Sequence, residues 1–148
     1  MWLAVGLRTS LLVIVAILIM GVCNQASAQK CLEYGPTVTL TGRLYSRVFP
    51  GPPNYESIRK GDKKETALLL KLVKKVCVAG KDVQNLEISE TGVRDVQLVI
   101  LNDKHWKTVR RVKGKRAIIT GTLFHGNTGH HRTKILIQVS NIKSAKNA

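Results

Sequence analysis

Three of the four histidines of the chain lie within seven residues, in the stretch Gly121-Thr-Leu-Phe-His-Gly-Asn-Thr-Gly-His-His-Arg-Thr133. They are His125, His130 and His131. An imidazole ring can bind a metal ion, transfer a proton or hydrogen-bond a polar ligand. Alternating apolar runs over 117–124 and 134–139 flank the stretch, and 126–129 is rich in residues that tolerate positive φ. The pattern predicts a β-hairpin with the histidines at its mouth.

A transition-metal site is one interpretation of this cluster. His125 would combine with His130 or His131, and Glu56 or Asp62 would complete the ligands of a zinc, copper or nickel ion. Adjacent residues of a strand point to opposite faces, so His130 and His131 cannot both join His125 in strand geometry. The plain alternative is that the histidines are solvated or hydrogen-bonded residues of a hairpin tip.

A second unusual stretch begins at Phe49-Pro-Gly-Pro-Pro-Asn-Tyr-Glu-Ser-Ile and continues to Glu65. Its prolines and glycine exclude regular structure at the start, while 55–60 can form a helical turn. Connections of this length are usually functional or mobile, and the prolines indicate that this one is stiffened. The composition is typical of a binding loop.

A non-enzymatic binding site is the interpretation that we favour. The Pro-rich loop 49–65 and the His-rich hairpin 121–133 would enclose a cleft whose rings and cations suit a small ligand or a strand of oligosaccharide or nucleic acid. The candidate ligand-binding residues are Tyr55, Glu56, Arg59, Lys60, Phe124, His125, His130, His131 and Arg132, with Lys134 beside them. Catalysis by a histidine base is least favoured, because the sequence has no nucleophile elbow, phosphate loop or zinc-protease motif.

The first element that would position these stretches is a half-buried strand over 38–48. Val38, Leu40, Leu44 and Val48 alternate with polar residues, and Gly42 indicates a bend or bulge. Further strands are expected over 66–78, 93–101, 117–124 and 134–142, and the polar segment 80–92 is expected to be a surface loop.

A short helix is expected over 104–113, with Asn102 or Asp103 as its N-cap and Gly114 after its end. Trp106 and Val109 share one face of this helix, suited to plug the end of a barrel. The solvent side would carry basic side chains, namely Lys107, Arg110 and Arg111.

The order of strands with one helix between the third and fourth is that of the OB-fold. We therefore expect a mainly β protein with a small five-stranded OB-fold-like barrel; an open five-stranded sandwich is the alternative. In an OB-fold, the loop between strands one and two and the loop between strands four and five lie beside one binding face. The Pro-rich loop and the His-rich hairpin are thus predicted neighbours.

The first 28 residues have the features of a cleaved signal peptide. Arg8 precedes the apolar run 11–20, and Ala26-Ser-Ala28 is a small-residue cleavage site. The run is short for a membrane span, and Met20-Gly21-Val22 fits poorly before a lipidated Cys23. We expect export to the periplasm or the extracellular space, with residues 29–148 forming a single domain and no transmembrane span in the mature chain.

The predicted mature chain is strongly basic. The whole chain has 24 Lys and Arg against 9 Asp and Glu, and removing Arg8 leaves 23 − 9 = +14. This excess favours anionic partners, and after export we favour envelope or extracellular polymers; a nucleic-acid-binding OB protein is the alternative. Two cysteines, Cys31 and Cys77, survive cleavage and predict a disulfide in an oxidising compartment.

Two stretches of the chain also resemble a known family. They are Phe49-Pro-Gly-Pro-Pro-Asn-Tyr-Glu-Ser-Ile and Gly121-Thr-Leu-Phe-His followed by Thr128-Gly-His-His. Both are similar to an uncharacterised family of exported proteobacterial proteins, domain of unknown function 4431. The resemblance implies a secreted bacterial protein and assigns no catalytic residue. Arg132 stands where the family's pattern has another histidine, which makes the cluster poorer in metal ligands here.

Overall fold

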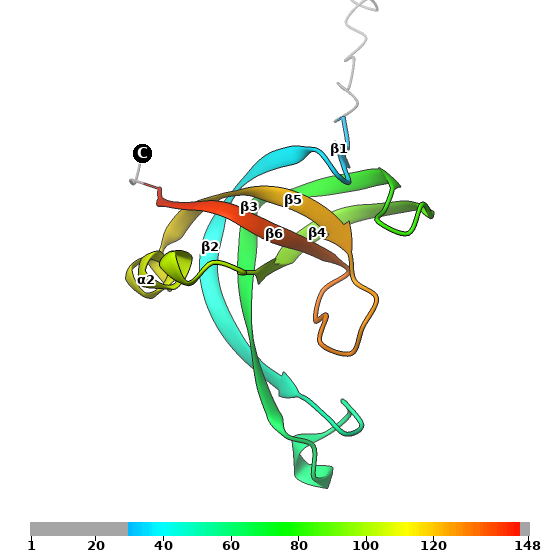
Figure 1. Ribbon diagram of the computed structural model, residues 1–148, viewed down its shortest axis with the longest axis vertical. Coiled ribbons are helices and arrows are strands. Elements are labelled where there is room, and N and C mark those ends of the chain that lie inside the picture. The colour runs from blue at the N-terminus through cyan, green and yellow to red at the C-terminus, as the bar shows by residue number, and fades with distance from the viewer. Residues whose placement is uncertain (1–29, 146–148) are drawn as a thin grey trace, which may run out of the picture.

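The computed structural model describes residues 30–145, so the predicted signal peptide lies outside the described residues. These residues form a mainly β structure with one α-helix (Figure 1). The strands are β1 (Leu32–Glu33), β2 (Thr37–Pro50), β3 (Lys64–Lys81), β4 (Glu87–Val99), β5 (Arg116–His125) and β6 (Ile135–Ser144). The helices are the 3-10 turn η1 (Ile58–Lys60) and α2 (Asp103–Val112).

Five of the strands pair in a closed ring. β2 pairs antiparallel with β3 and β5, β3 with β4, and β5 with β6; a parallel pairing of β4 with β6 closes the ring. Alternate side chains of each strand point inward, where Leu44, Leu70, Ile119, Leu123 and Ile137 are fully buried. The predicted mainly β fold, with one helix between the third and fourth ring strands, is confirmed.

Gly42 is the point at which β2 changes partners. It is paired with Leu72 of β3 on one side and Ala117 of β5 on the other, so the predicted bulge is not at this residue. A Cβ atom at Gly42 would lie 2.4 Å from the Lys71 carbonyl oxygen. Glycine is therefore required by the close approach of the neighbouring strand.

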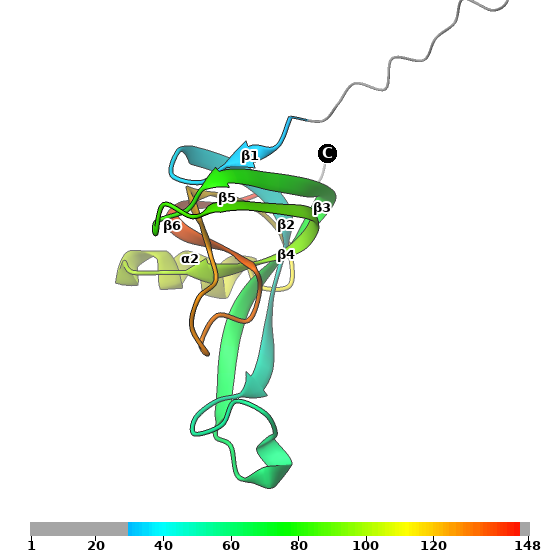
Figure 2. The same cartoon turned by 90° about the vertical axis from the view of Figure 1, so that its right-hand side faces the viewer.

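Beyond the ring, β2 and β3 continue as a long hairpin over residues 46–68, which we call the arm. The arm projects away from the ring and carries the Pro-rich loop at its tip (Figures 1 and 2). The predicted burial of Val48 is wrong, since this residue is 50% exposed. The alternation of apolar and polar residues continues into the arm, but the hydrophobic core that would bury the apolar side chains does not extend there.

The prediction of a surface loop over 80–92 is wrong. β3 and β4 continue as a hairpin, and the turn between them is confined to 82–86. The Asp82 carboxylate accepts hydrogen bonds from the backbone N–H groups of Gln84 and Leu86, at 2.9 and 3.0 Å. Asn85 adopts φ 59°, a left-handed conformation that asparagine tolerates. This local closure brings Glu90 into a strand.

α2 begins where the sequence predicted, because the Asn102 side chain accepts from the Lys104 N–H at 2.9 Å. Val109 and Val112 are buried against the ring. Trp106, predicted to plug the end of the ring with Val109, is instead 41% exposed. Within residues 30–145, no helix is both long and apolar enough to cross a membrane.

The predicted disulfide between Cys31 and Cys77 is confirmed. It attaches the N-terminal segment to β3, and the adjacent β1 pairs in parallel with Val78 and Ala79 of the same strand. The sequence did not predict β1. The disulfide joins the residue before β1 to the residue before Val78, its partner in β3.

Candidate functional site

The β5–β6 loop, residues 126–134, folds back over the outer face of the ring. Phe124, Leu136, Gln97 and Leu69 are cross-strand neighbours in one row of that face. Leu69 and Leu136 are buried although they do not belong to the main core cluster. A Cβ at Gly126 would lie 3.2 Å from a Leu136 methyl group, so the loop backbone covers this row closely.

Gln97 fixes the position of the loop on the ring. Its side-chain oxygen accepts from the Arg132 N–H, and its side-chain nitrogen donates to the His130 carbonyl at 3.1 Å. Its own backbone N–H donates to the Thr133 hydroxyl at 3.0 Å. These bonds hold His130 and Arg132 on the side of the loop that faces the arm.

The arm and the β5–β6 loop meet through five side chains, which we call the clamp: Phe49, Tyr55, Glu65, His130 and Arg132. Glu65 accepts from Arg132 Nη2 at 2.6 Å and from His130 Nδ1 at 2.7 Å. In that tautomer His130 Nε2 accepts from the Tyr55 hydroxyl, 3.1 Å away. Tyr55 and His130 also meet edge to face, with ring centroids 5.4 Å apart.

Arg132 occupies the centre of the clamp. Its side chain is 8% exposed, and its guanidinium carbon lies 5.5 Å from the Phe49 ring centroid and 5.3 Å from that of Tyr55. Stacking on aromatic rings and a carboxylate partner together suit a guanidinium that is removed from water. The clamp therefore joins the two loops through their own side chains.

The other two histidines have separate partners. His131 Nδ1 accepts from the N–H groups of Asn127 and Thr128 at 2.9 and 3.3 Å, and its ring meets Phe124 edge to face. His125 Nε2 lies 3.4 Å from Glu90, and the same carboxylate binds the Lys134 ammonium at 3.0 Å. The three imidazoles thus do not share a centre.

The remaining predicted site residues lie at the tip of the arm. Arg59 and Lys60 are exposed in η1, and Glu56 is exposed beside it. The Asp62 carboxylate accepts from the backbone N–H groups of Ser57, Asn54 and Glu56, and these bonds hold its pKa below the usual range. Asp62 thus caps its own loop, and in the described part of the chain no group of three His, Cys, Asp or Glu is placed to hold a metal.

A shallow hollow of about 520 Å³ lies on the β5–β6 loop itself. His125, His131, Arg132 and Lys134 contribute to its lining, together with other residues of the loop. Of the Arg and Lys side chains in its lining, Lys134 is bonded to Glu90 and Arg132 to Glu65. Little positive charge is left there for an incoming anion.

Unpaired positive charge gathers instead on another part of the ring. Arg43 on β2 is in register with Lys71 on β3 and with Arg116 on β5, so three cations lie side by side. The Arg43 Nε–H donates to the Gly114 carbonyl at 3.0 Å, which joins this row to the end of α2. We call the following six residues the basic surface: Arg43, Lys71, Arg110, Lys113, Lys115 and Arg116.

All six side chains of the basic surface are exposed, and none forms an ion pair within residues 30–145. The nearest carboxylate in the row is Asp95, in register with Lys71, and it accepts from the Tyr45 hydroxyl at 3.0 Å. Like charges directly opposite one another on neighbouring strands destabilise a sheet. An anionic partner would relieve that repulsion.

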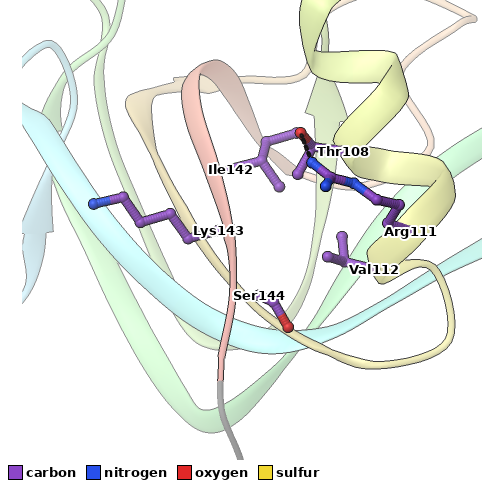
Figure 3. A pocket seen from close by; sticks show the side chains of 6 residues that line it. All are labelled: Thr108, Arg111, Val112, Ile142, Lys143 and Ser144. Atoms are coloured by element: carbon purple, nitrogen blue, oxygen red, sulfur yellow. Dashed lines mark hydrogen bonds between the residues drawn. The ribbon is translucent and has the colours of Figure 1, made fainter.

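A further hollow, of about 370 Å³, lies between the end of α2 and β6 (Figure 3). Arg111 Nη2 donates to the Thr108 hydroxyl at 3.3 Å, so its guanidinium turns back onto its own helix. Figure 3 shows Lys143 pointing away from Arg111. This hollow therefore does not extend the basic surface.

Sequence reasoning missed Glu65, Glu90 and Gln97 in the loop contacts, and it missed the basic row. One signal was available for the carboxylates: with 9 acidic residues against 24 basic ones, each acid has many cations to pair with. The basic row needed strand register, because Arg43, Lys71 and Arg116 are far apart in the sequence.

The free energy of unfolding is expected to fall in two stages as the pH is lowered from 7 to 4. Burial, with a smaller contribution from the charge of His130, lowers the pKa of His131 in the folded state. Below about pH 6.5 the unfolded state therefore binds this proton more readily than the folded state, and the free energy of unfolding falls. Hydrogen bonds from His130 to Glu65 and from Lys134 to Glu90 lower the pKa of each carboxyl. Their stabilisation is present above about pH 4.5 and is lost below it.

Urea unfolding at a series of pH values measures both stages. His131→Asn keeps a hydrogen-bond acceptor near the Asn127 and Thr128 N–H groups and removes the imidazole. This variant should lose the first stage and keep the second. An unchanged first stage in the variant would show that His131 does not cause it.

Comparison with protein families gives a match in the C-terminal part of the chain. Residues 95–143 match the family described as Domain of unknown function (DUF4431), and the resemblance to that family is thereby confirmed. The matched residues run from β4 to β6 and include the His-rich hairpin, whereas the stretch from Phe49 to Ile58 lies outside them. Comparison with curated proteins finds no match.

Proposed function

We propose that the protein is an exported, non-enzymatic binding module that holds anionic polymers of the envelope or extracellular space on its basic surface. The observation that carries the proposal is the contrast between two sets of cations. Arg132 and Lys134 of the β5–β6 loop are bonded to Glu65 and Glu90, whereas the basic surface has no carboxylate partner in the described chain. Fixed cations attract a polyanion because its bound counterions are released.

Export rests on the sequence of residues 1–28 and is supported by the Cys31–Cys77 disulfide. Structural disulfides persist in oxidising compartments and are rare in the cytosol. In such a location, acidic polysaccharide is a more abundant polyanion than nucleic acid.

We also propose that the ring is an OB-type barrel. Three observations support this assignment: the five-stranded pairing order, the parallel β4–β6 closure, and the helix between β4 and β5. Barrels of this type bind oligosaccharides and oligonucleotides beside the loops between strands one and two and between strands four and five. Here the clamp residues are bonded to one another across those loops, whereas the basic surface forms no ion pair among the described residues, which favours a contact there.

Neutralising the row of three cations should weaken polymer binding specifically. The variant Arg43→Gln/Lys71→Gln/Arg116→Gln removes three positive charges from the basic surface. We expect its affinity for heparin or polygalacturonate to fall about tenfold or more, and the slope of log affinity against log salt to fall by about 2. Isothermal titration at several salt concentrations measures both quantities.

The matched control is Lys60→Gln/Lys81→Gln/Arg94→Gln, which removes the same charge from exposed residues elsewhere. We expect the control to bind within about twofold of the parent chain, because net charge alone contributes little beyond the Debye length. Equal loss in both triple variants would mean that the attraction is diffuse, and the basic surface would have no special role.

A further inference from the structure

A groove of about 270 Å³ lies between α2 and the arm. Ser46 and Thr66 line it from the arm, Leu98 from β4, Trp106 and Arg110 from α2, and Lys113 from the C-cap of that helix. Figure 1 shows α2 and the β5–β6 loop on opposite sides of the arm. None of the five clamp residues lines the groove, although Gln97, which holds the β5–β6 loop, does. Arg110 and Lys113 make the groove continuous with the basic surface.

Trp106 is the unusual residue of this groove. It follows Asn102 by one helical turn and is 41% exposed, whereas Val109 on the same side of α2 is 3% exposed. Its indole N–H meets no acceptor in residues 30–145. A large aromatic side chain with an open face and a free donor is a common feature of ligand sites.

The polar groups around Trp106 are also available. The Ser46 and Thr66 side chains make no hydrogen bond within the described chain, and Arg110 and Lys113 form no ion pair there. The groove therefore presents one aromatic face, two hydroxyl groups and two cations. Its volume is below the usual range for drug-sized ligands, which limits it to a single ring of a larger molecule.

We infer that this groove binds one sugar ring of an acidic polysaccharide. This inference rests on the proposed function. The apolar C–H face of the ring would pack on Trp106, its hydroxyls would bond Ser46 or Thr66, and its carboxylate or sulfate would meet Arg110 or Lys113. Surfaces that stack single-stranded nucleic acid usually present several aromatic rings along the strand, and here there is one. The lining thus favours sugar over nucleobase.

Trp106 provides its own reporter. The chain has two tryptophans, and Trp2 lies in the segment that we expect to be removed on export. In the exported protein, indole fluorescence should change saturably with tetragalacturonate and not with its neutral methyl ester. Trp106→Ala should weaken tetragalacturonate binding about tenfold, and Trp106→Phe should retain most of it, because a ring is kept.

The outcomes separate this inference from the proposed function. Suppose that tetragalacturonate binds without changing the indole fluorescence, and that Trp106→Ala binds it as tightly as the parent chain. The groove is then not the sugar site, while binding at the basic surface is unaffected. If the parent chain binds none of the anionic polymers tested, both the groove and the proposed function are overturned. A single-stranded oligonucleotide that binds more tightly, with the same fluorescence change, would overturn the choice of sugar. Thermal melting of each variant confirms that it is folded.

Discussion

Replacing Cys31 and Cys77 by serine is expected to lower the free energy of unfolding by about 4 kcal/mol in the chain-entropy model. The two residues are 46 positions apart, so the disulfide restricts a long segment of the unfolded chain. In the folded state it also holds β1 against β3. We expect β1 to detach first, because a two-residue strand makes few bonds of its own.

Urea unfolding of the parent and the double-serine variant measures this difference, and free-thiol titration of the unfolded, unreduced parent should find neither residue reactive. Reduction of the parent should reproduce the effect of the substitutions. If the variant is destabilised by less than about 1 kcal/mol, the loop-closure account is wrong for this protein.

Arg132→Gln is expected to lower the free energy of unfolding by about 2 kcal/mol. The substitution leaves Glu65 without its closest cation and removes the guanidinium from between Phe49 and Tyr55. We place the loss below that of a fully buried pair, because the Glu65 side chain is 32% exposed and water screens it. Chemical denaturation measures the change.

Lys134→Gln is the matched control, since Lys134 belongs to the same loop and pairs with a carboxylate while 75% exposed. Its loss should be at most about 0.5 kcal/mol. A double-mutant cycle of Arg132→Gln with Glu65→Gln should show coupling of about 1 kcal/mol or more. Equal effects of the two loop substitutions would contradict the central position assigned to Arg132.

The strands of the ring and the helix α2 could be predicted from the sequence because both depend on local residue patterns. The alternation of Leu40 and Leu44 with polar neighbours sets the inward face of β2, and Asn102 marks the start of α2. The neighbourhood of Tyr55 and His130 followed from the order of elements alone. The bonds that Glu65 and Arg132 make between the two loops could not be predicted, because the positions of these residues depend on where two long strands end. The ligand cleft between the loops stays a prediction.

Other features depended on tertiary register. Glu90 lies in a strand because the Asp82 carboxylate closes a tight turn, which a polar composition does not distinguish from a loop. Trp106 has the helical spacing of a core residue, but it lines the groove between α2 and the arm, where its side chain is exposed. Both of these wrong predictions, the loop over 80–92 and the burial of Trp106, concern segments whose surroundings are set by residues distant in the sequence.

Amide chemical-shift mapping with polygalacturonate oligomers at low salt tests the central claim most directly. We expect the largest perturbations at Arg43, Lys71 and Arg116 and along 104–116, with the 126–134 loop unchanged. All of these perturbations should disappear as salt is raised, because the contact is electrostatic. Perturbations concentrated at Tyr55, His130 and Arg132, with the basic surface unmoved, would contradict it.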